Sequence, residues 1–337
     1  MPDNRRNPLE RALSVFADVR PGEGWPTLLL MLAIFLLLTA YYIIKPVREG
    51  LILSGGGAEV KSYAAAGQAV LLLGIVPIYG RLADRLPRLR LITAVTFFFV
   101  ACLGLFFVLG QAGVPLGVPF YLWVGIFNVM IIAQLWSFAN DVFTTGQGKR
   151  LFAIVGFGAS SGAVVGNVVV ERLIAPLGIY PPMLVAAALL VLSLGLTRLA
   201  GNCRLPDEGA GPDQAGARDD ADDEAPLAGT GVFRLIANNR YLLLLALLML
   251  VANWVNTTGE YLLGRLVEDA AAAAPAVGGT DGLTEGEWIG RFYAGFYKWV
   301  NLAALLTQLF LVSRLVKYLG VRVCLLLLPV IALGGYG

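Results

Sequence analysis

The strongest constraint on the fold of this sequence is a succession of nine apolar segments. They lie near residues 25–50, 62–80, 91–110, 119–140, 150–171, 180–199, 240–263, 289–313 and 321–337. A helix needs about 20 apolar residues to cross a lipid bilayer. Because 58% of the residues are hydrophobic and only 14% are charged, the chain has too little polar surface to coat a soluble globule. The sequence therefore predicts an all-α integral membrane protein.

Basic residues gather in alternate connections between these segments. The connection between the second and third segments is rich in arginine, Lys149 and Arg150 follow the fourth segment, and residues 111–118 contain no basic residue. By the positive-inside rule, the N-terminus and the basic connections are cytoplasmic. We expect a multi-pass protein of the cytoplasmic membrane, typical of a bacterial inner membrane, without a cleaved signal peptide.

The chain divides into four predicted regions. Residues 1–24 form a cytoplasmic segment in which Leu9, Leu13, Phe16 and Val19 predict an amphipathic helix at the membrane surface. Residues 25–200 form an N-terminal six-helix bundle, and the acidic residues 201–230 form a disordered cytoplasmic linker. Residues 231–337 hold about three helices of an incomplete C-terminal bundle. We expect a C-terminally truncated form of a protein with about twelve helices.

Composition argues against several function classes. The chain has no histidine, which is the commonest general base and metal ligand, and its three cysteines are widely spaced. A net charge of +2 does not suggest nucleic-acid binding. The turn at 140–150 lacks the spacing and the preceding strand of a phosphate-binding loop. We therefore expect no enzyme activity, no cofactor and no metal.

The first apolar segment contains a charged run that demands an explanation. Lys45, Arg48 and Glu49 share one side of a helix, and Pro46 predicts a kink that exposes carbonyls to a cavity. A cation at the centre of a membrane helix costs about 2.5–3.5 kcal/mol on insertion scales. The run indicates a binding site, and the alternative is that its charges only extend to the membrane surface.

Three later segments add candidates for the same site. Asn256 and Glu260 lie on one face of the seventh segment together with Asn253, as in a cavity-lining stripe, unless Glu260 only marks the helix end. Lys298 lies among aromatic residues in the eighth segment and is the expected partner of Glu260 or of a substrate phosphate, unless these aromatic residues only form an interfacial belt. Asn128 in the fourth segment is either a cavity residue or an interhelical hydrogen-bonding group.

Other residues predict packing and gating. Gly158, Gly162 and Gly166 recur at every fourth position, which favours close helix packing. Asp84 and Arg85 in Gly-Arg-Leu-Ala-Asp-Arg resemble the loop between helices 2 and 3 of major facilitator transporters, or else form a solvated basic loop that sets topology. Asp141 with Lys149 or Arg150 is expected to form a latch between the fourth and fifth segments.

Several motifs together resemble the ATP:ADP antiporter family, and particularly its bacterial relatives in the major facilitator superfamily. The resemblance is carried by residues 19–23 (Val-Arg-Pro-Gly-Glu), 45–49 (Lys-Pro-Val-Arg-Glu), 138–141 (Phe-Ala-Asn-Asp), 148–152 (Gly-Lys-Arg-Leu-Phe) and 256–261 (Asn-Thr-Thr-Gly-Glu-Tyr). It implies a two-bundle transporter in which Arg48 and Glu260 contribute to substrate transport. The chain departs from the family in having no acidic residue between Arg85 and Asn140.

These observations predict a transporter that exchanges nucleotides of the ATP/ADP type by alternating access. The expected substrate site comprises Lys45, Arg48, Glu49, Asn128, Asn256, Glu260 and Lys298, and the substrate is a nucleotide or another organic anion. The alternatives are a major facilitator transporter for a different solute and a non-transporting membrane scaffold or sensor. The sequence predicts no oligomeric state.

Overall fold

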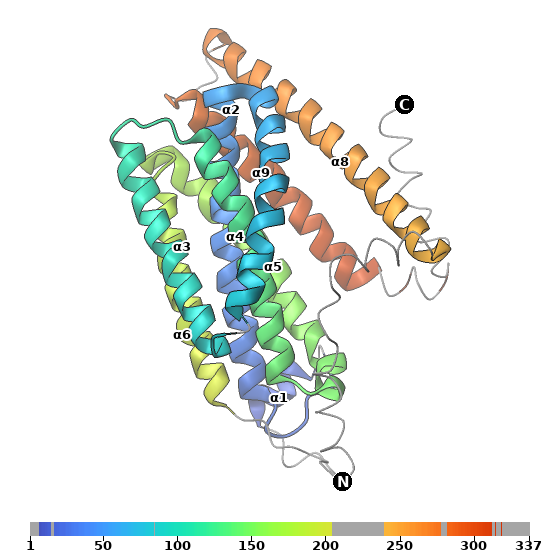
Figure 1. Ribbon diagram of the computed structural model, residues 1–337. Helices are drawn as coiled ribbons and strands as arrows, with labels where there is room; N and C mark the ends of the chain where they lie inside the picture. The colour runs from blue at the N-terminus through green and yellow to red at the C-terminus, as the bar shows by residue number, and fades with distance from the viewer. Residues whose placement is uncertain are drawn as a thin grey trace.

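The computed structural model describes residues 7–14, 17–83, 85–203, 239–277 and 282–311, together with residues 314 and 318. Within these ranges all regular structure is helical (Figure 1). The elements are α1 (Pro8–Leu13), α2 (Gly24–Ala83), α3 (Arg88–Gln111), α4 (Gly117–Val142), α5 (Thr145–Leu177), α6 (Pro182–Asn202), α8 (Arg240–Ala273), η1 (Ala274–Val277), α9 (Glu285–Leu306) and η2 (Thr307–Leu311). Among the described residues, six helices are long and apolar enough to cross a membrane: α2, α3, α4, α5, α6 and α8. The prediction of an all-α membrane protein is confirmed at this level.

Helix α2 contains the first two predicted segments, joined at a sharp bend. Gly57 is its only internal residue with non-helical backbone angles, and its φ of 75° is one that glycine adopts without strain. After Gly57 the helix turns back toward the end of the bundle where α2 begins (Figure 1). Pro46 keeps helical backbone angles, and the sharp bend of α2 lies eleven residues later, at Gly57. We call the two ends of the bundle the N-terminal end and the kink end.

The first half of α2, residues 24–56, forms the centre of the described structure. It is apolar around most of its circumference, as is typical of a helix buried on all sides. It contacts α4, α5, α6 and α9, and Leu30, Ile43, Ile44 and Val47 are fully buried. Any charged side chain on this half is therefore enclosed by other helices.

The three evenly spaced glycines of α5 pack directly against α2. An added Cβ at Gly158, Gly162 or Gly166 would lie 2.7, 2.4 or 2.5 Å from a backbone carbonyl oxygen of α2. Such distances are too short for any side chain, so only glycine permits this approach of the two backbones. The packing prediction for these residues is confirmed.

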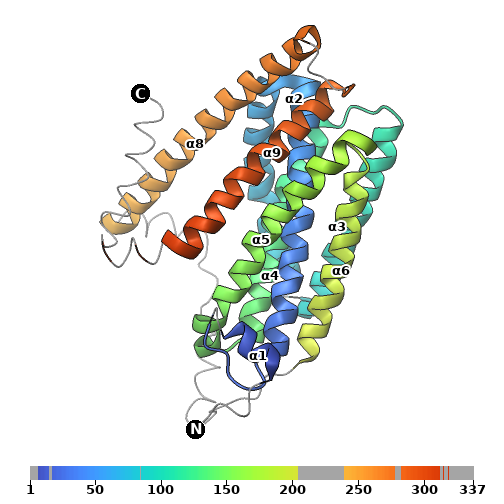
Figure 2. The same ribbon diagram turned by 180° about the vertical axis from the view of Figure 1, so that it is seen from behind.

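Helices α8 and α9 join the rest of the protein mainly at the kink end. The buried residues of α8 are Gly264, Val267 and Ala271, all in its second half. Those of α9 begin at Ile289 and end at Ala294, in its first half. Toward the N-terminal end α8 diverges from the bundle (Figures 1 and 2), whereas α9 stays beside α5 as far as Gln308 of η2, which accepts a 2.9 Å hydrogen bond from Ser160.

Several predicted boundaries differ from the structure. The N-terminal helix has only six residues, and Val19 is buried beside the bundle in the segment that follows it, before a turn at Gly22. The predicted connection between the seventh and eighth segments is helical as far as Ala273, and α9 already begins at Glu285. Most of the predicted linker and the whole ninth segment lie outside the described residues.

Candidate functional site

The charged run of α2 forms an ion-pair network with a lysine from the other side of the bend. Arg48 donates to Oε1 of Glu49 through Nε at 3.1 Å and also through Nη2. The ammonium of Lys61 lies 2.8 Å from Oε2 of the same carboxylate. Because Lys61 follows Gly57, the bend is what brings it to Glu49. We call Lys45, Arg48, Glu49 and Lys61 the charge cluster.

The charge cluster is enclosed and carries excess positive charge. The side chain of Glu49 is 0% exposed, that of Lys61 is 6% exposed and that of Arg48 is 12% exposed. Three cations and one carboxylate leave two positive charges uncompensated within the cluster. Keeping such charges inside an apolar bundle costs several kcal/mol per ion unless a partner neutralises them.

Tyrosine rings surround the cations. The ammonium of Lys45 lies 4.0 Å from the ring centre of Tyr297 in α9 and 5.7 Å from that of Tyr42. The guanidinium of Arg48 lies 4.7 Å from the ring of Tyr121 in α4. Within the described residues Lys45 forms no ion pair, so aromatic faces are its immediate neighbours. Cation–π contacts stabilise a cation by about 0.5–2 kcal/mol, less than a full negative charge would in a desolvated site.

The tyrosine from α9 that is nearest to Lys61 also has unused hydrogen-bonding capacity. Tyr293 is 1% exposed, its ring centre lies 5.7 Å from the Lys61 ammonium, and its buried hydroxyl has no hydrogen-bond partner in the described structure. A buried hydroxyl without a partner costs about 1–3 kcal/mol. The cluster therefore adjoins a polar group that a ligand oxygen can satisfy.

Lys298 has a different partner from the expected one. Its ammonium lies 2.7 and 3.0 Å from the carboxylate oxygens of Glu171 in α5. The expectation that Lys298 pairs with Glu260 is corrected, because α9 crosses α5 and places the lysine on Glu171. This partly exposed pair links the two helices and leaves Lys298 outside the charge cluster.

The other predicted site residues lie at the margin of the cluster or away from it. Glu260 is exposed on α8 and accepts a 3.4 Å hydrogen bond from Asn256. Asn128 is half-buried on α4, and no described contact joins it to the cluster. The structure thus brings Lys45, Arg48 and Glu49 together, and no hydrogen bond or ion pair among the described residues joins Glu260 to them.

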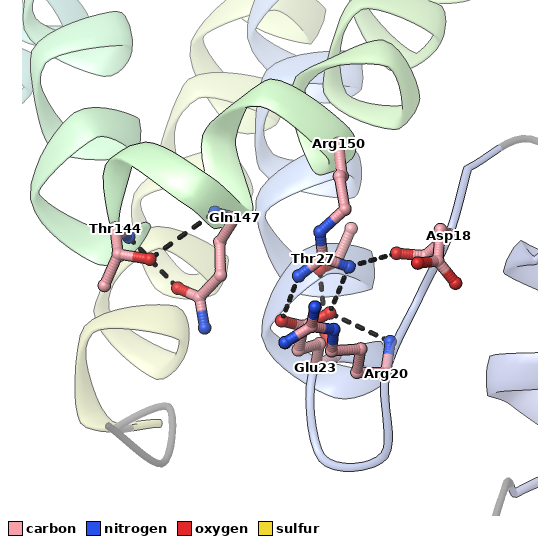
Figure 3. Close-up of polar contacts among 7 residues, drawn as sticks. All are labelled: Asp18, Arg20, Glu23, Thr27, Thr144, Gln147 and Arg150. Atoms are coloured by element: carbon pink, nitrogen blue, oxygen red, sulfur yellow. Dashed lines mark hydrogen bonds and ion pairs between the residues drawn. The ribbon is translucent and has the colours of Figure 1, made fainter. Parts of the chain in front are cut away.

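At the N-terminal end, Arg150 ties α5 to the segment before α2 (Figure 3). It donates to both carboxylate oxygens of Glu23, at 2.9 and 3.2 Å, and to the backbone carbonyl of Asp18. Glu23 also accepts from the backbone N–H of Arg20 at 2.9 Å, which holds the turn in place. Beside it, Thr144 and Gln147 form a capping box that starts α5, so the 140–150 turn joins two helices as expected.

The remaining gating candidates are distributed differently from the prediction. Asp141 pairs with Arg88 of α3 at 3.1 Å, so the latch expected between Asp141 and Arg150 is corrected. Arg85 is exposed in the turn after α2. Asp84 and the side chain of Lys149 lie outside the described residues.

Three charged residues of these networks were not predicted. Lys61 lies just after Ser-Gly-Gly-Gly at 54–57. Such a glycine-rich sequence predicts a loop, so the continuation of the helix on both sides of it was not expected. A charge bordering a glycine-rich break between two apolar segments is the signal that points to Lys61. Glu171 and Glu23 each pair with a residue 127 positions away, and no local pattern reveals such a partner.

Comparison with known proteins identified no relative. The chain matches no known family model, no curated protein and no solved structure at a significant level. The function of the charge cluster must therefore be inferred from the chain's own residues.

Proposed function

We propose that this protein is a multi-pass membrane transporter of an organic anion, and that nucleotides of the ATP/ADP type are its substrates. The observation that carries the proposal is the excess positive charge of the charge cluster, enclosed among tyrosines in an apolar bundle. Enclosed charge in a membrane protein is costly, and it marks binding sites and transport paths. An anionic ligand supplies the missing negative charge.

Lys45 is the cation best placed to meet such a ligand. Arg48 and Lys61 already share Glu49, whereas Lys45 lies against the faces of Tyr42 and Tyr297. A ligand phosphate beside Lys45 replaces a cation–π contact with an ion pair, which is stronger in a desolvated site. The adjoining tyrosine rings provide flat surfaces on which a nucleobase can stack.

The charge cluster can offset part of the charge of a nucleotide. A di- or triphosphate carries about three to four negative charges, and several fixed cations must offset the cost of desolvating it. The cluster provides two excess positive charges, which offset about half of that negative charge. The motifs that resemble ATP:ADP antiporters include Arg48, Glu49 and Glu260, which is a second and independent reason to choose nucleotides within the class of organic anions.

The arrangement of α8 and α9 is consistent with access from one side. Helix α8 packs against the bundle at the kink end and diverges from it toward the N-terminal end, while α9 follows α5 as far as Gln308 (Figure 1). Transporters that work by alternating access have a central site that opens to one side at a time. We propose that the diverging end faces the cytoplasm, since the basic connections and the N-terminus lie there.

Counterflow in proteoliposomes tests the substrate. Full-length protein is reconstituted with unlabelled ATP inside, and labelled ADP is added outside, with protein-free liposomes as the blank. The expected result is transient accumulation of label that depends on internal nucleotide. A panel of phosphorylated metabolites and carboxylates, run in the same way, identifies another anion if nucleotides are not exchanged.

A second candidate is a transporter of a different solute. The absence of acidic residues between Arg85 and Asn140 favours it, because this is where the chain departs from the nucleotide exchangers it resembles. Flux of a non-nucleotide anion in the panel would select this candidate. A folded protein that moves none of these anions would favour a membrane scaffold or sensor.

A further inference from the structure

The bend of α2 is capped by a carboxylate from another helix. Ala58 follows the non-helical residue Gly57 and so begins the second half of α2, where backbone N–H groups need acceptors from outside the helix. Its backbone N–H donates to Oε2 of Glu268 in α8, at 3.1 Å. A Cβ on Gly57 would lie 2.8 Å from Oε1 of Glu268, so the glycine also makes room for this carboxylate. A negative charge at a helix N-terminus is stabilised both by the hydrogen bond and by the helix dipole.

Close packing surrounds this cap. Glycines at the interface let α2 and α9 approach, since a Cβ on Gly50 would lie 2.5 Å from the carbonyl oxygen of Gly286 and 3.3 Å from the Cα of Gly290. A small apolar cluster covers the same region and consists of Ile52, Leu53, Ala58, Ala64, Tyr121, Val267, Ala271, Ile289 and Tyr293. The cluster includes Tyr293, whose ring also lies near Lys61, so this packing closes the kink end over the charge cluster.

Glu268 has an alternative partner on its own helix. Arg265, one turn earlier in α8, lies 3.7 Å from the same oxygen that caps Ala58. Both residues are partly exposed, at 46% for the arginine and 27% for the glutamate side chain. If α8 moves away from α2, the carboxylate exchanges the cap for a closer pair with Arg265 and is not left without a partner. An element with two satisfied arrangements has the property that a switch requires.

We propose that Glu268 is a releasable latch, which holds the kink end closed by capping α2 at Gly57 and opens that end when it turns to Arg265. This inference rests on the proposed transport function, because it assigns the latch to the access path of the same site. The cap consists of one charge-assisted hydrogen bond, so its loss shifts the ratio of closed to open forms by about tenfold. A shift of this size permits exchange between the two forms.

Distance measurements between α2 and α8 test the latch without relying on transport. Spin labels are placed on cysteines at the exposed positions Glu59 and Ala272 of the full-length protein in nanodiscs, after the native cysteines are replaced by serine. We expect the parent protein to show mainly a short distance between the labels. In Glu268→Ala, the population with a longer distance should increase about tenfold relative to the short one. Asp269→Ala is the matched control, since it removes the same charge from the neighbouring exposed residue.

Two further variants make the test independent of one substitution. Glu268→Gln keeps an oxygen that can accept from Ala58 and should give an intermediate shift. Arg265→Met removes the alternative partner and should shift the distances in the opposite direction, toward the closed form. The latch would be overturned if folded Glu268→Ala and Glu268→Gln gave the same distances as the parent protein. It would also be overturned if Arg265→Met shifted the distances toward the open form, as Glu268→Ala is expected to do. Opposite shifts in a protein that moves no anion would keep the latch and reject the transport proposal.

Discussion

Glu49 is enclosed between two cations, and neutralising it should destabilise the protein severely. In Glu49→Gln, Arg48 and Lys61 lose their shared carboxylate while remaining buried, with side chains 12% and 6% exposed. Removing one partner of a buried ion pair costs about 3–5 kcal/mol, because the remaining charge is desolvated without compensation. Glu171→Gln is the matched control. It breaks the ion pair with Lys298, whose side chains are 24% and 28% exposed, and should cost about 1 kcal/mol.

Steric trapping in bicelles measures the free energy of unfolding of both variants directly. The same assay on Glu49→Gln in a Lys61→Met background provides a double-mutant cycle. With one cation already removed, the cost of neutralising Glu49 should fall by about 1–3 kcal/mol. Equal losses in Glu49→Gln and Glu171→Gln, or a cost of Glu49→Gln that does not depend on Lys61, would refute the enclosed network.

Two further predictions concern residues of α5: a glycine that packs against α2 and the arginine that holds the N-terminal segment. Gly162→Ala should lower the free energy of unfolding by about 1–3 kcal/mol, because its new Cβ would lie 2.4 Å from a carbonyl oxygen of α2. The control Gly195→Ala places its Cβ in open space and should be neutral or stabilising. Equal effects of the two substitutions in the same unfolding assay would contradict the packing. Arg150→Met should release the segment that Glu23 anchors, so proteinase K should cleave residues 14–20 several-fold faster. The control is Arg81→Met at an exposed position. Cleavage of Arg150→Met that is no faster than that of the control would argue against this role.

The membrane class and the positions of the long helices follow from the sequence because they depend on local composition. Apolar segments of about 20 residues predict helices whatever their neighbours are. The glycine spacing in α5 also predicts its function in packing, since small residues one turn apart form a continuous groove. Boundaries are less predictable. Helix α9 begins at Glu285 because Thr284 and Glu287 form a capping box. This signal is missed when helices are located only by their apolar residues.

The candidate site was predictable only in part, for a physical reason. Lys45, Arg48 and Glu49 stand out because charges interrupt an apolar segment within a few residues of one another. Lys61 joins them only because the chain reverses at Gly57, and Glu171 meets Lys298 only because α9 crosses α5. Such contacts depend on how whole helices pack, which composition and spacing do not determine.

The central claim is that the charge cluster binds the transported anion, and Lys45 gives its cleanest test. Lys45 can be changed without breaking the ion pairs of Glu49, whereas replacing Arg48 would confound binding with stability. The measurement is initial uptake of the labelled anion identified by counterflow, in proteoliposomes containing wild type, Lys45→Met or Arg172→Met, with equal amounts of folded protein. Arg172 is an exposed cation on α5 and serves as the matched control.

A hydrogen bond to a charged group contributes about 1.5–3 kcal/mol, which corresponds to roughly a tenfold to hundredfold change in affinity. We therefore predict that Lys45→Met lowers uptake at subsaturating anion by at least about tenfold, while Arg172→Met transports like the wild type. Uptake by Lys45→Met at the wild-type rate would contradict the account.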